Sequence, residues 1–395
     1  GRDDVDHTDG PTAQRDSVAE PDIEITVVPI EAGYRVEHPR GSGNHASAAT
    51  AVDGVISALN LTTLYASPRH AHLHAGGLTA GDGAILLTAP SGAGKSTLVT
   101  AAVEAGFGYL SDERIGIDAT GLAHPYHKPL SLKQASWPLL PHLQPSDAGD
   151  DHRIWQIPAS RISPEIDGRL LAGPTTPRLV LRVRHEPDAA PRFEPISRGA
   201  AAAAMVLNSM DFDVIGPDTI VWFGRALATA RTGTLVSGSL APTVGLLRAL
   251  AAEAVESGPE PELVAVATRG GPHTGSAEEA AITDVPGLRD GTTVVSIDDE
   301  LLVHEPETRQ VVVLNPAAGA IVAGIDGERT WAGLAAVTGS SHDAVLALAV
   351  ELGARGLLAG ARRSAEPPSW PELGQGAWRW DGDGRGGGRG VWGWW

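Results

Sequence analysis

The chain has 395 residues, 42% hydrophobic and 20% charged, as expected of a globular protein with a buried core and two or three domains. Its net charge of -18 argues against nucleic acid or an anionic membrane as a partner. The absence of cysteine excludes disulfides, thiolate metal sites and thiol nucleophiles. No apolar run approaches the about 20 residues that span a bilayer, and the first residues are acidic rather than signal-like, so we expect a cytoplasmic protein.

The first part of the chain combines a polar segment with short regular elements. Residues 1–22 are rich in Asp, which predicts a disordered acidic tail. A strand is predicted at 25–28 and an Ala-rich helix over 47–61. Residues 73–88 alternate turn signals with apolar stretches and predict two strands, the second over 84–88.

The next elements predict the fold class. A helix is expected from Gly94 to Ala105 with Gly106 as its C-cap, followed by a strand from Gly108. Together with the preceding strand these elements form a β-loop-α-β unit. We therefore expect an α/β core with a parallel sheet.

The middle of the chain gives weaker signals. Residues 114–118 and 122–126 flank Ala-Thr-Gly and predict a hairpin. A strand is expected at 179–183 and a helix at 200–210. Residues 242–255 predict a further helix, because Pro242 falls in its first turn and leucines follow at helical spacing.

A composition break separates a second, smaller domain. Residues 258–290 are rich in Gly, Pro, Thr and acidic residues and predict a linker. Beyond it, three short strands (294–297, 301–304, 311–314) and three helices (317–325, 331–337, 344–352) are expected. The predicted domains are a P-loop domain over 23–257 and an α+β domain over 291–362, followed by a Gly/Trp-rich tail over 363–395 with no assigned function.

The segment Ala89–Ser96 fits the phosphate-binding Walker A pattern, with Ala89 where Gly is commoner. Gly92 and Gly94 allow backbone N–H groups to turn toward phosphate oxygens at a helix N-terminus. Lys95 supplies a charge for the β- and γ-phosphates, and the Ser96 hydroxyl is a Mg²⁺ ligand. The expected nucleotide-binding residues are Ser91, Gly92, Ala93, Gly94, Lys95, Ser96 and Thr97.

Carboxylates and a histidine lie at short separations from this loop. Asp112 and Glu113 end the strand after the loop helix, Asp112 falling 16 residues after Ser96. His74 lies 21 residues before Lys95. Phosphoryl transfer needs positioning, a metal and a base on the acceptor, and these residue types provide them.

The residues His74, Ala89–Ser96 and Asp112-Glu113 resemble the catalytic core of the HPr kinase/phosphorylase superfamily. The resemblance implies ATP and Mg²⁺ as cofactors, Asp112 as general base, Glu113 as a metal ligand and His74 as a residue that positions or stabilises charge. Lys95 completes the catalytic set. The second acidic residue is typically Asp in that family, and no HPr-docking elements are found here, so HPr is not the expected substrate.

Other polar residues near these motifs allow simpler readings. His70, His72 and His74 alternate and would share one face of a strand, which raises the alternative of a zinc site. No further cluster of metal ligands lies near them in the sequence, which disfavours zinc.

Five more residues receive no catalytic assignment. His124, His127 and Lys128 are expected in a surface loop, with Lys128 within possible reach of a phosphate. Arg182 and Arg184 are candidates for a charge clamp on the γ-phosphate and are left unassigned.

The second domain resembles the PqqD-type recognition elements that bind leader peptides of ribosomally made natural products. The resemblance rests on Val294–Ile297, Leu301–Pro306, Gln310–Pro316 and the Asp326–Thr330 segment. It implies a winged-helix fold to which an extended peptide adds a strand. Basic residues in this window are too sparse for DNA binding. The expected leader-binding residues are Val311, Val312, Val313, Leu314 and Leu348.

Together the two resemblances predict a kinase that phosphorylates a hydroxyl, in the first place a serine, of a precursor peptide, as in lasso-peptide clusters. Other enzymes of the cluster are expected partners, and the kinase resemblance suggests a homo-oligomer. Two alternatives stay open. One is a small-molecule kinase whose second domain recruits partners, and the other is a non-catalytic scaffold that presents a leader-binding module.

Overall fold

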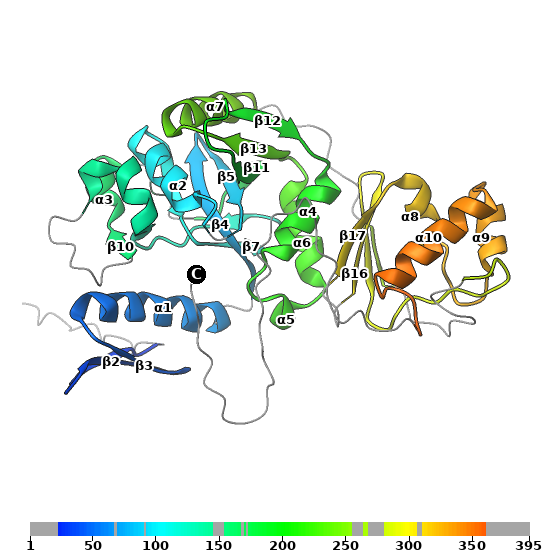
Figure 1. The fold of residues 1–395 in the computed structure, drawn as a ribbon, viewed down its shortest axis with the longest axis horizontal. Coiled ribbons are helices and arrows are strands. Elements are labelled where there is room, and N and C mark those ends of the chain that lie inside the picture. The colour runs from blue at the N-terminus through cyan, green and yellow to red at the C-terminus, as the bar shows by residue number, and fades with distance from the viewer. Residues whose placement is uncertain are drawn as a thin grey trace, which may run out of the picture. The chain divides into compact units, whose positions relative to one another are not determined.

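The computed structural model describes residues 23–66, 69–90, 92–144, 154–166, 170, 173–254, 264–267, 280–305 and 310–360 (Figure 1). The expected tails at 1–22 and 363–395 lie outside the described residues, as does most of the expected linker. The chain divides into two compact units: the first ends at Ala66, and the second holds the rest of the chain.

The first unit is a three-stranded antiparallel sheet with one helix. Its elements are β1 (Thr26–Ile30), β2 (Gly33–His38), β3 (Gly41–His45) and α1 (Ala48–Ala66). The strands follow one another as a meander, with Val27 opposite Val36. A small core of Val36, Ala51 and Ala58 joins the helix to the sheet.

The second unit is built on an eight-stranded mixed sheet. In order across the sheet, the strands run β12, β13, β11, β5, β4, β7 and β8, and β6 also pairs with β4. Strand β11 is parallel to both β5 and β13, so the predicted α/β class is confirmed. The strands are β4 (His70–Ala80), β5 (Gly83–Thr88), β6 (Gly108–Ser111), β7 (Arg114–Asp118), β8 (Ala123–His124), β11 (Thr176–His185), β12 (Arg192–Pro195) and β13 (Arg231–Ser237).

The β-loop-α-β unit predicted that the strand after the loop helix, β6, would extend the parallel part of the sheet. The structure differs from this prediction. Strands β4 and β5 form a hairpin with Ala80 opposite Gly83, and β11 lies on the other side of β5. Both edges of β5 are thus occupied. Strand β6 therefore pairs antiparallel with β4, with Leu78 opposite Tyr109. The hairpin of β4 and β5, which are adjacent in the sequence, thus determines the order of the strands here.

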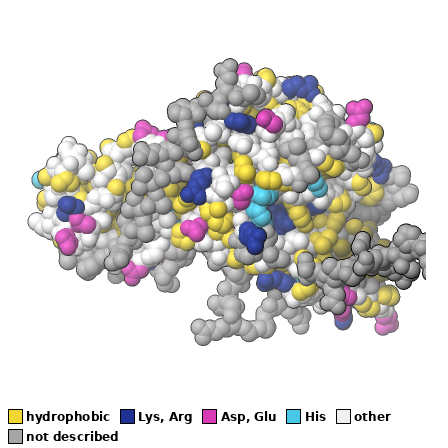
Figure 2. Space-filling model, turned by 180° about the vertical axis from the view of Figure 1, so that it is seen from behind, with side chains coloured by type: hydrophobic (Ala, Val, Ile, Leu, Met, Phe, Trp, Pro, Cys, Tyr) yellow, Lys and Arg dark blue, Asp and Glu magenta, His cyan; other side chains and the backbone are white. Residues whose placement is uncertain are grey.

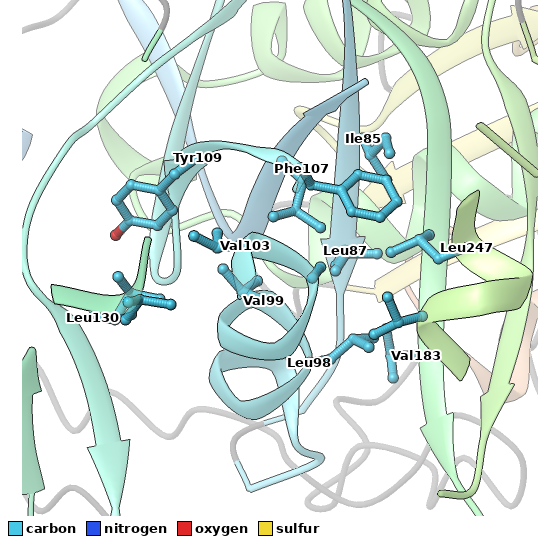
Figure 3. Packing of buried hydrophobic residues seen from close by; sticks show 14 of the residues in the cluster. Ile85, Leu87, Leu98, Val99, Val103, Phe107, Tyr109, Leu130, Val183 and Leu247 are labelled. Atoms are coloured by element: carbon cyan, nitrogen blue, oxygen red, sulfur yellow. The ribbon is translucent and has the colours of Figure 1, made fainter. Parts of the chain in front are cut away.

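Two pairs of helices cover the two faces of this sheet: α2 (Lys95–Glu104) with α7 (Leu240–Glu253), and α4 (Arg198–Leu207) with α6 (Asp218–Leu227). Alternating residues of β5 supply both cores, because successive side chains of a strand point to opposite faces. Ile85 and Leu87 pack with α2 and α7, whereas Leu86 packs with α4 and α6. Figure 3 shows the first core, with Tyr109 and Val183 on opposite sides of α2.

A second sheet, in the order β14-β15-β16-β17, lies against the other side of α4 and α6. Strand β14 falls within the stretch expected to be linker and pairs antiparallel with β15. The elements are β14 (Val264–Ala267), β15 (Thr293–Ile297), β16 (Glu300–Glu305), β17 (Gln310–Leu314), α8 (Pro316–Ala323), α9 (Trp331–Thr338) and α10 (His342–Ala354).

Strands β15, β16 and β17 of this second sheet contribute side chains to a core on each face. Val294 on β15 packs in the core formed with α8, α9 and α10, whereas its neighbour Val295 packs in the core that contains α4 and α6. Arg198, at the start of α4, also pairs with Asp298 at the β15–β16 turn at 3.1 Å. The layers of the second unit therefore alternate as helices, large sheet, α4 and α6, small sheet, helices (Figure 1).

Short elements complete the described chain. They are β9 (Leu130–Lys133), β10 (Ile154–Ile157), the 3₁₀ helices η1 (Gln134–Leu139) and η2 (Pro141–Leu143), α3 (Ala159–Ile162) and α5 (Phe212–Ile215). Strands β9 and β10 form a separate antiparallel pair. Among the helices that the structure describes, none has the length and hydropathy needed to cross a membrane.

Candidate functional site

The Walker A segment forms the connection between β5 and α2. Gly92 and Gly94 have φ of +85° and +87°, a left-handed conformation that residues with a Cβ rarely adopt. A Cβ built at either position meets no atom within 4 Å, so the backbone conformation rather than crowding requires glycine. Gly94 is the N-cap of α2, and the helix start offers backbone N–H groups to an anion. Ser91 lies outside the described residues.

Lys95 is folded back over the loop. Its Nζ donates a hydrogen bond of 2.6 Å to the carbonyl oxygen of Ala89. Burial lowers the pKa of Lys95 to about 8, although the Asp112 carboxylate acts in the opposite direction. The loop lysine therefore lies close to the acidic pair, and its charge is only partly compensated by the protein.

The two hydroxyl residues after Lys95 differ in their surroundings. Thr97, expected to bind nucleotide, is buried and its hydroxyl lies 2.7 Å from that of Ser136 in η1. Ser96 is half-buried in the first turn of α2, and its carbonyl accepts a hydrogen bond from Thr100. The side chain of Thr97 thus anchors the helix to η1, while Ser96 stands at the loop end.

The acidic pair lies at the end of β6. Asp112 is buried: Lys128 Nζ lies 2.7 Å from Oδ1, and the Ser131 N–H donates to Oδ2 at 2.8 Å. The hydroxyl of Tyr109 is 3.4 Å from the same Oδ1 and donates to the carbonyl of Lys128 at 2.9 Å. Glu113 Oε2 lies 3.2 Å from the same Nζ. One lysine thus joins both carboxylates.

Lys128 is not the surface-loop residue that the sequence predicted. Only 6% of its side chain is exposed, and its ammonium also donates to the Pro129 carbonyl and the Ser131 hydroxyl. Burial lowers the pKa of Lys128, but the carboxylates of Asp112 and Glu113 raise it more, so the net shift is upward. The lysine therefore remains charged. It lies in the loop before β9, which turns it inward onto the acidic pair.

His74 belongs to the same buried cluster. Burial, and after it the charge of Lys95, lowers the pKa of His74 to about 3, while a hydrogen bond to the backbone of Glu113 opposes the shift. Its imidazole is therefore neutral at physiological pH. The structure thus brings together His74, Lys95, Asp112 and Glu113, four of the residues singled out in the sequence.

The other histidines of β4 have separate partners. His72 Nδ1 lies 2.7 Å from Asp211 Oδ2, and the ring of His70 lies 4.1 Å from that of His124. Within the described ranges, no three histidine or acidic side chains are placed to hold a metal ion, so the zinc alternative gains no support. Histidine side chains are visible together beside acidic and basic ones on one face of the molecule (Figure 2).

The arginines that were left unassigned lie on β11. Arg184 pairs with Glu186 and Glu194 and is partly exposed. Arg182 is half-buried. The ion pairs of Arg184 link β11 with β12 and give it a structural explanation.

The side chains expected to bind the leader pack in or against the hydrophobic cores of the chain itself. Val311 and Val313 pack with the core of α4 and α6, whereas Val312 and Leu314 pack with the core of α8–α10. Leu348, on α10, is half-buried against this latter core. Strand β17 is the last strand in the order of its sheet, so the edge offers its backbone rather than its side chains.

Comparisons with known proteins add little to this geometry. No protein-family model and no curated protein matches the chain. Among solved structures, the HPr(Ser) kinase/phosphatase from Coxiella burnetii is similar at 13% identity and a TM-score of 0.23, over 46% of this chain and 94% of that chain. This score is too low to establish a shared fold.

Proposed function

We propose that this protein is an ATP-dependent phosphotransferase. The observation that carries the proposal is the cluster formed by the loop lysine and the buried acidic pair: Lys95 is close enough for Asp112 and Glu113 to alter its pKa. A glycine loop at a helix N-terminus binds phosphate, and a nearby carboxylate is the base that an acceptor hydroxyl needs. A phosphate-binding loop alone would support binding but not transfer.

The residues present suit ATP and Mg²⁺. The loop from Gly92 to Ser96 would hold the phosphates, and Ser96 with Glu113 would supply oxygen ligands, the type that Mg²⁺ prefers. When bound, ATP–Mg²⁺ supplies the phosphoryl group and a cation that offsets its charge.

Three side chains have distinct tasks in this proposal. Asp112 takes the proton from the acceptor hydroxyl while the hydroxyl oxygen attacks the γ-phosphorus of ATP. The bond between that phosphorus and the oxygen of ADP breaks, and ADP leaves. Lys95 holds the phosphates. His74, being neutral, orients groups by hydrogen bonding rather than by charge.

The acceptor in this proposal is a serine hydroxyl of a ribosomally made precursor peptide. Strand β17 is the end strand of its sheet, and an extended leader could add its backbone there, with apolar side chains against α10. Capture of the leader would raise the local concentration of the acceptor at the kinase site.

Phosphorylation of a precursor is testable by mass spectrometry. The protein is incubated with ATP, Mg²⁺ and each precursor peptide encoded beside its gene, and we expect a gain of about 80 Da, one phosphate, on a serine. Transfer to a small molecule with no gain on any precursor would replace the peptide by a small-molecule acceptor. Leader binding without any transfer would favour a scaffold.

A pair of substitutions on α10 tests the leader site. Leu348→Asp should weaken binding of a fluorescent leader peptide by at least about tenfold, or 1.4 kcal/mol, because a charge would replace the apolar side chain that the leader contacts in this proposal. Val350→Asp is the matched control, since Val350 is 49% exposed on the same helix. Equal affinities of the two variants, measured by fluorescence anisotropy, would contradict this placement of the leader.

The lowered pKa of Lys95 predicts a pH dependence of ATP binding. Above about pH 8 the free protein carries a neutral Lys95, whereas bound phosphate favours the ammonium. Binding should then take up a proton, and affinity should fall by up to about tenfold per pH unit above pH 8. Calorimetry at pH 7 and 9 in two buffers measures both effects. Lys95→Arg, which stays charged, should lose this dependence. A wild-type affinity for ATP that does not change between pH 7 and 9 would contradict the prediction.

A further inference from the structure

The ammonium of Lys128 is surrounded by oxygen atoms from four residues. Its Nζ is 2.7 Å from Asp112 Oδ1, 3.2 Å from Glu113 Oε2, 3.1 Å from the Pro129 carbonyl and 2.9 Å from the Ser131 hydroxyl. An ammonium has three N–H donors, so four acceptors exceed what it can satisfy with separate hydrogen bonds. Two carboxylates, a carbonyl and a hydroxyl are also the ligand types of a hard cation.

We infer that Lys128 is the internal cation of the acidic pair, and that Glu113 leaves it when Glu113 takes up the divalent cation of the nucleotide. This inference rests on the proposed function for its physiological setting, but the exchange itself involves no phosphoryl transfer. Lys128 is thus a positioning residue: it holds the two carboxylates close together until the metal arrives.

The two carboxylates are held unequally, which decides which one exchanges. Asp112 has the shorter contact to Lys128, its other oxygen accepts the Ser131 N–H, and its side chain is 1% exposed. Glu113 has the longer contact and its side chain is 12% exposed. Glu113 is also one methylene longer than Asp. Its side chain can therefore swing to a metal while Asp112 stays fixed.

The backbone of Glu113 limits this movement to the side chain. Its N–H donates to the Ser111 hydroxyl, and its carbonyl accepts from the N–H of Ala75 on β4. The length of the glutamate side chain then gives the reach that the exchange requires. Asp112 keeps Lys128 as its partner throughout, so the base is never left as an unpaired buried charge.

Removal of the ammonium tests the exchange without any substrate. Lys128→Met leaves two neighbouring carboxylates with no cation between them, which disfavours folding unless a metal binds. In EDTA this variant should melt below wild type, and Mg²⁺ without nucleotide should restore part of the loss. Its affinity for Mn²⁺, measured by calorimetry, should exceed that of wild type by roughly tenfold or more.

Two further variants serve as controls. Lys128→Arg keeps the cation and should gain no Mn²⁺ affinity. Lys128→Met combined with Glu113→Gln removes the exchanging carboxylate and should lose the gain. A folded Lys128→Met variant with wild-type Mn²⁺ affinity would overturn the inference.

Glu113→Gln alone keeps the test decisive if Lys128→Met fails to fold. Lys128 retains Asp112 in this variant, so the melting temperature in EDTA should stay close to that of wild type while Mn²⁺ binding in the presence of a nonhydrolysable ATP analogue falls. Unchanged Mn²⁺ binding would overturn Glu113 as the exchanging ligand. All these readouts are independent of phosphotransfer, so the inference can stand or fail apart from the kinase proposal.

Discussion

Asp112→Asn is expected to stop phosphoryl transfer while nucleotide binding continues. An amide cannot take the proton of the acceptor hydroxyl, and loss of a general base typically lowers the rate by about 10²- to 10⁴-fold. ATP affinity should change little, because the loop glycines and Lys95 contact the phosphates in this proposal. Single-turnover transfer assays and binding of a fluorescent ATP analogue separate the two effects.

Asp112→Asn should also destabilise the folded protein, so its free energy of unfolding must be measured together with the transfer rate. One Asp112 oxygen meets Lys128 and the other meets the Ser131 N–H, so an amide would place a donor against a donor. We expect a loss of about 1–3 kcal/mol in the free energy of unfolding. Asp118→Asn is the matched control, since Asp118 caps the turn after β7 and contacts His124 rather than the acidic pair. Wild-type turnover in Asp112→Asn would remove Asp112 as the base.

The loop and its helix were predictable because their signals are local. The glycines of Ala89–Ser96 and the apolar spacing of α2 depend on the backbone within a few residues. The pairing of β6 was not predictable in this way. It depends on which edges β5 had already filled, a property of the whole sheet.

Lys128 shows why one member of the candidate site escaped prediction. Its sequence neighbours His127 and Pro129 suggest a polar loop, and burial of a lysine is rare without a partner. The partner is Asp112, 16 residues earlier, and no local pattern connects the two. The alternation of Leu130 and Leu132, both buried on β9, was the available signal that this segment packs inward.

The sequence of helix α4 contains a clear indication that this helix is buried on all sides. Its sequence, from Arg198 to Leu207, contains five consecutive alanines, and a helix that is apolar on all sides is typically buried on all sides. In the structure it lies between two sheets. The parts of the chain predicted as two domains, 23–257 and 291–362, therefore share a continuous core at α4 and α6, through which the small sheet supports the large one.

Val295→Asp is expected to destabilise the nucleotide site together with the C-terminal sheet. Val295 is fully buried in the core formed with α4 and α6, and a buried unpaired charge costs about 4 kcal/mol or more. At its far end, α4 is followed by Asn208, whose carbonyl accepts the backbone N–H of His74 at 2.8 Å. Damage at Val295 should thus reach the strand that carries His74.

The measurement is a thermal melt followed in parallel with binding of a fluorescent ATP analogue. Both should fall together in Val295→Asp, whereas Val337→Asp, at a position 67% exposed on α9, should change neither. Normal ATP binding in a Val295→Asp variant whose small sheet has melted would show two independent domains and contradict the shared core. For the same reason, deleting the C-terminal sheet would expose α4 and α6, so substitutions such as Leu348→Asp separate leader capture from catalysis more cleanly than truncation does.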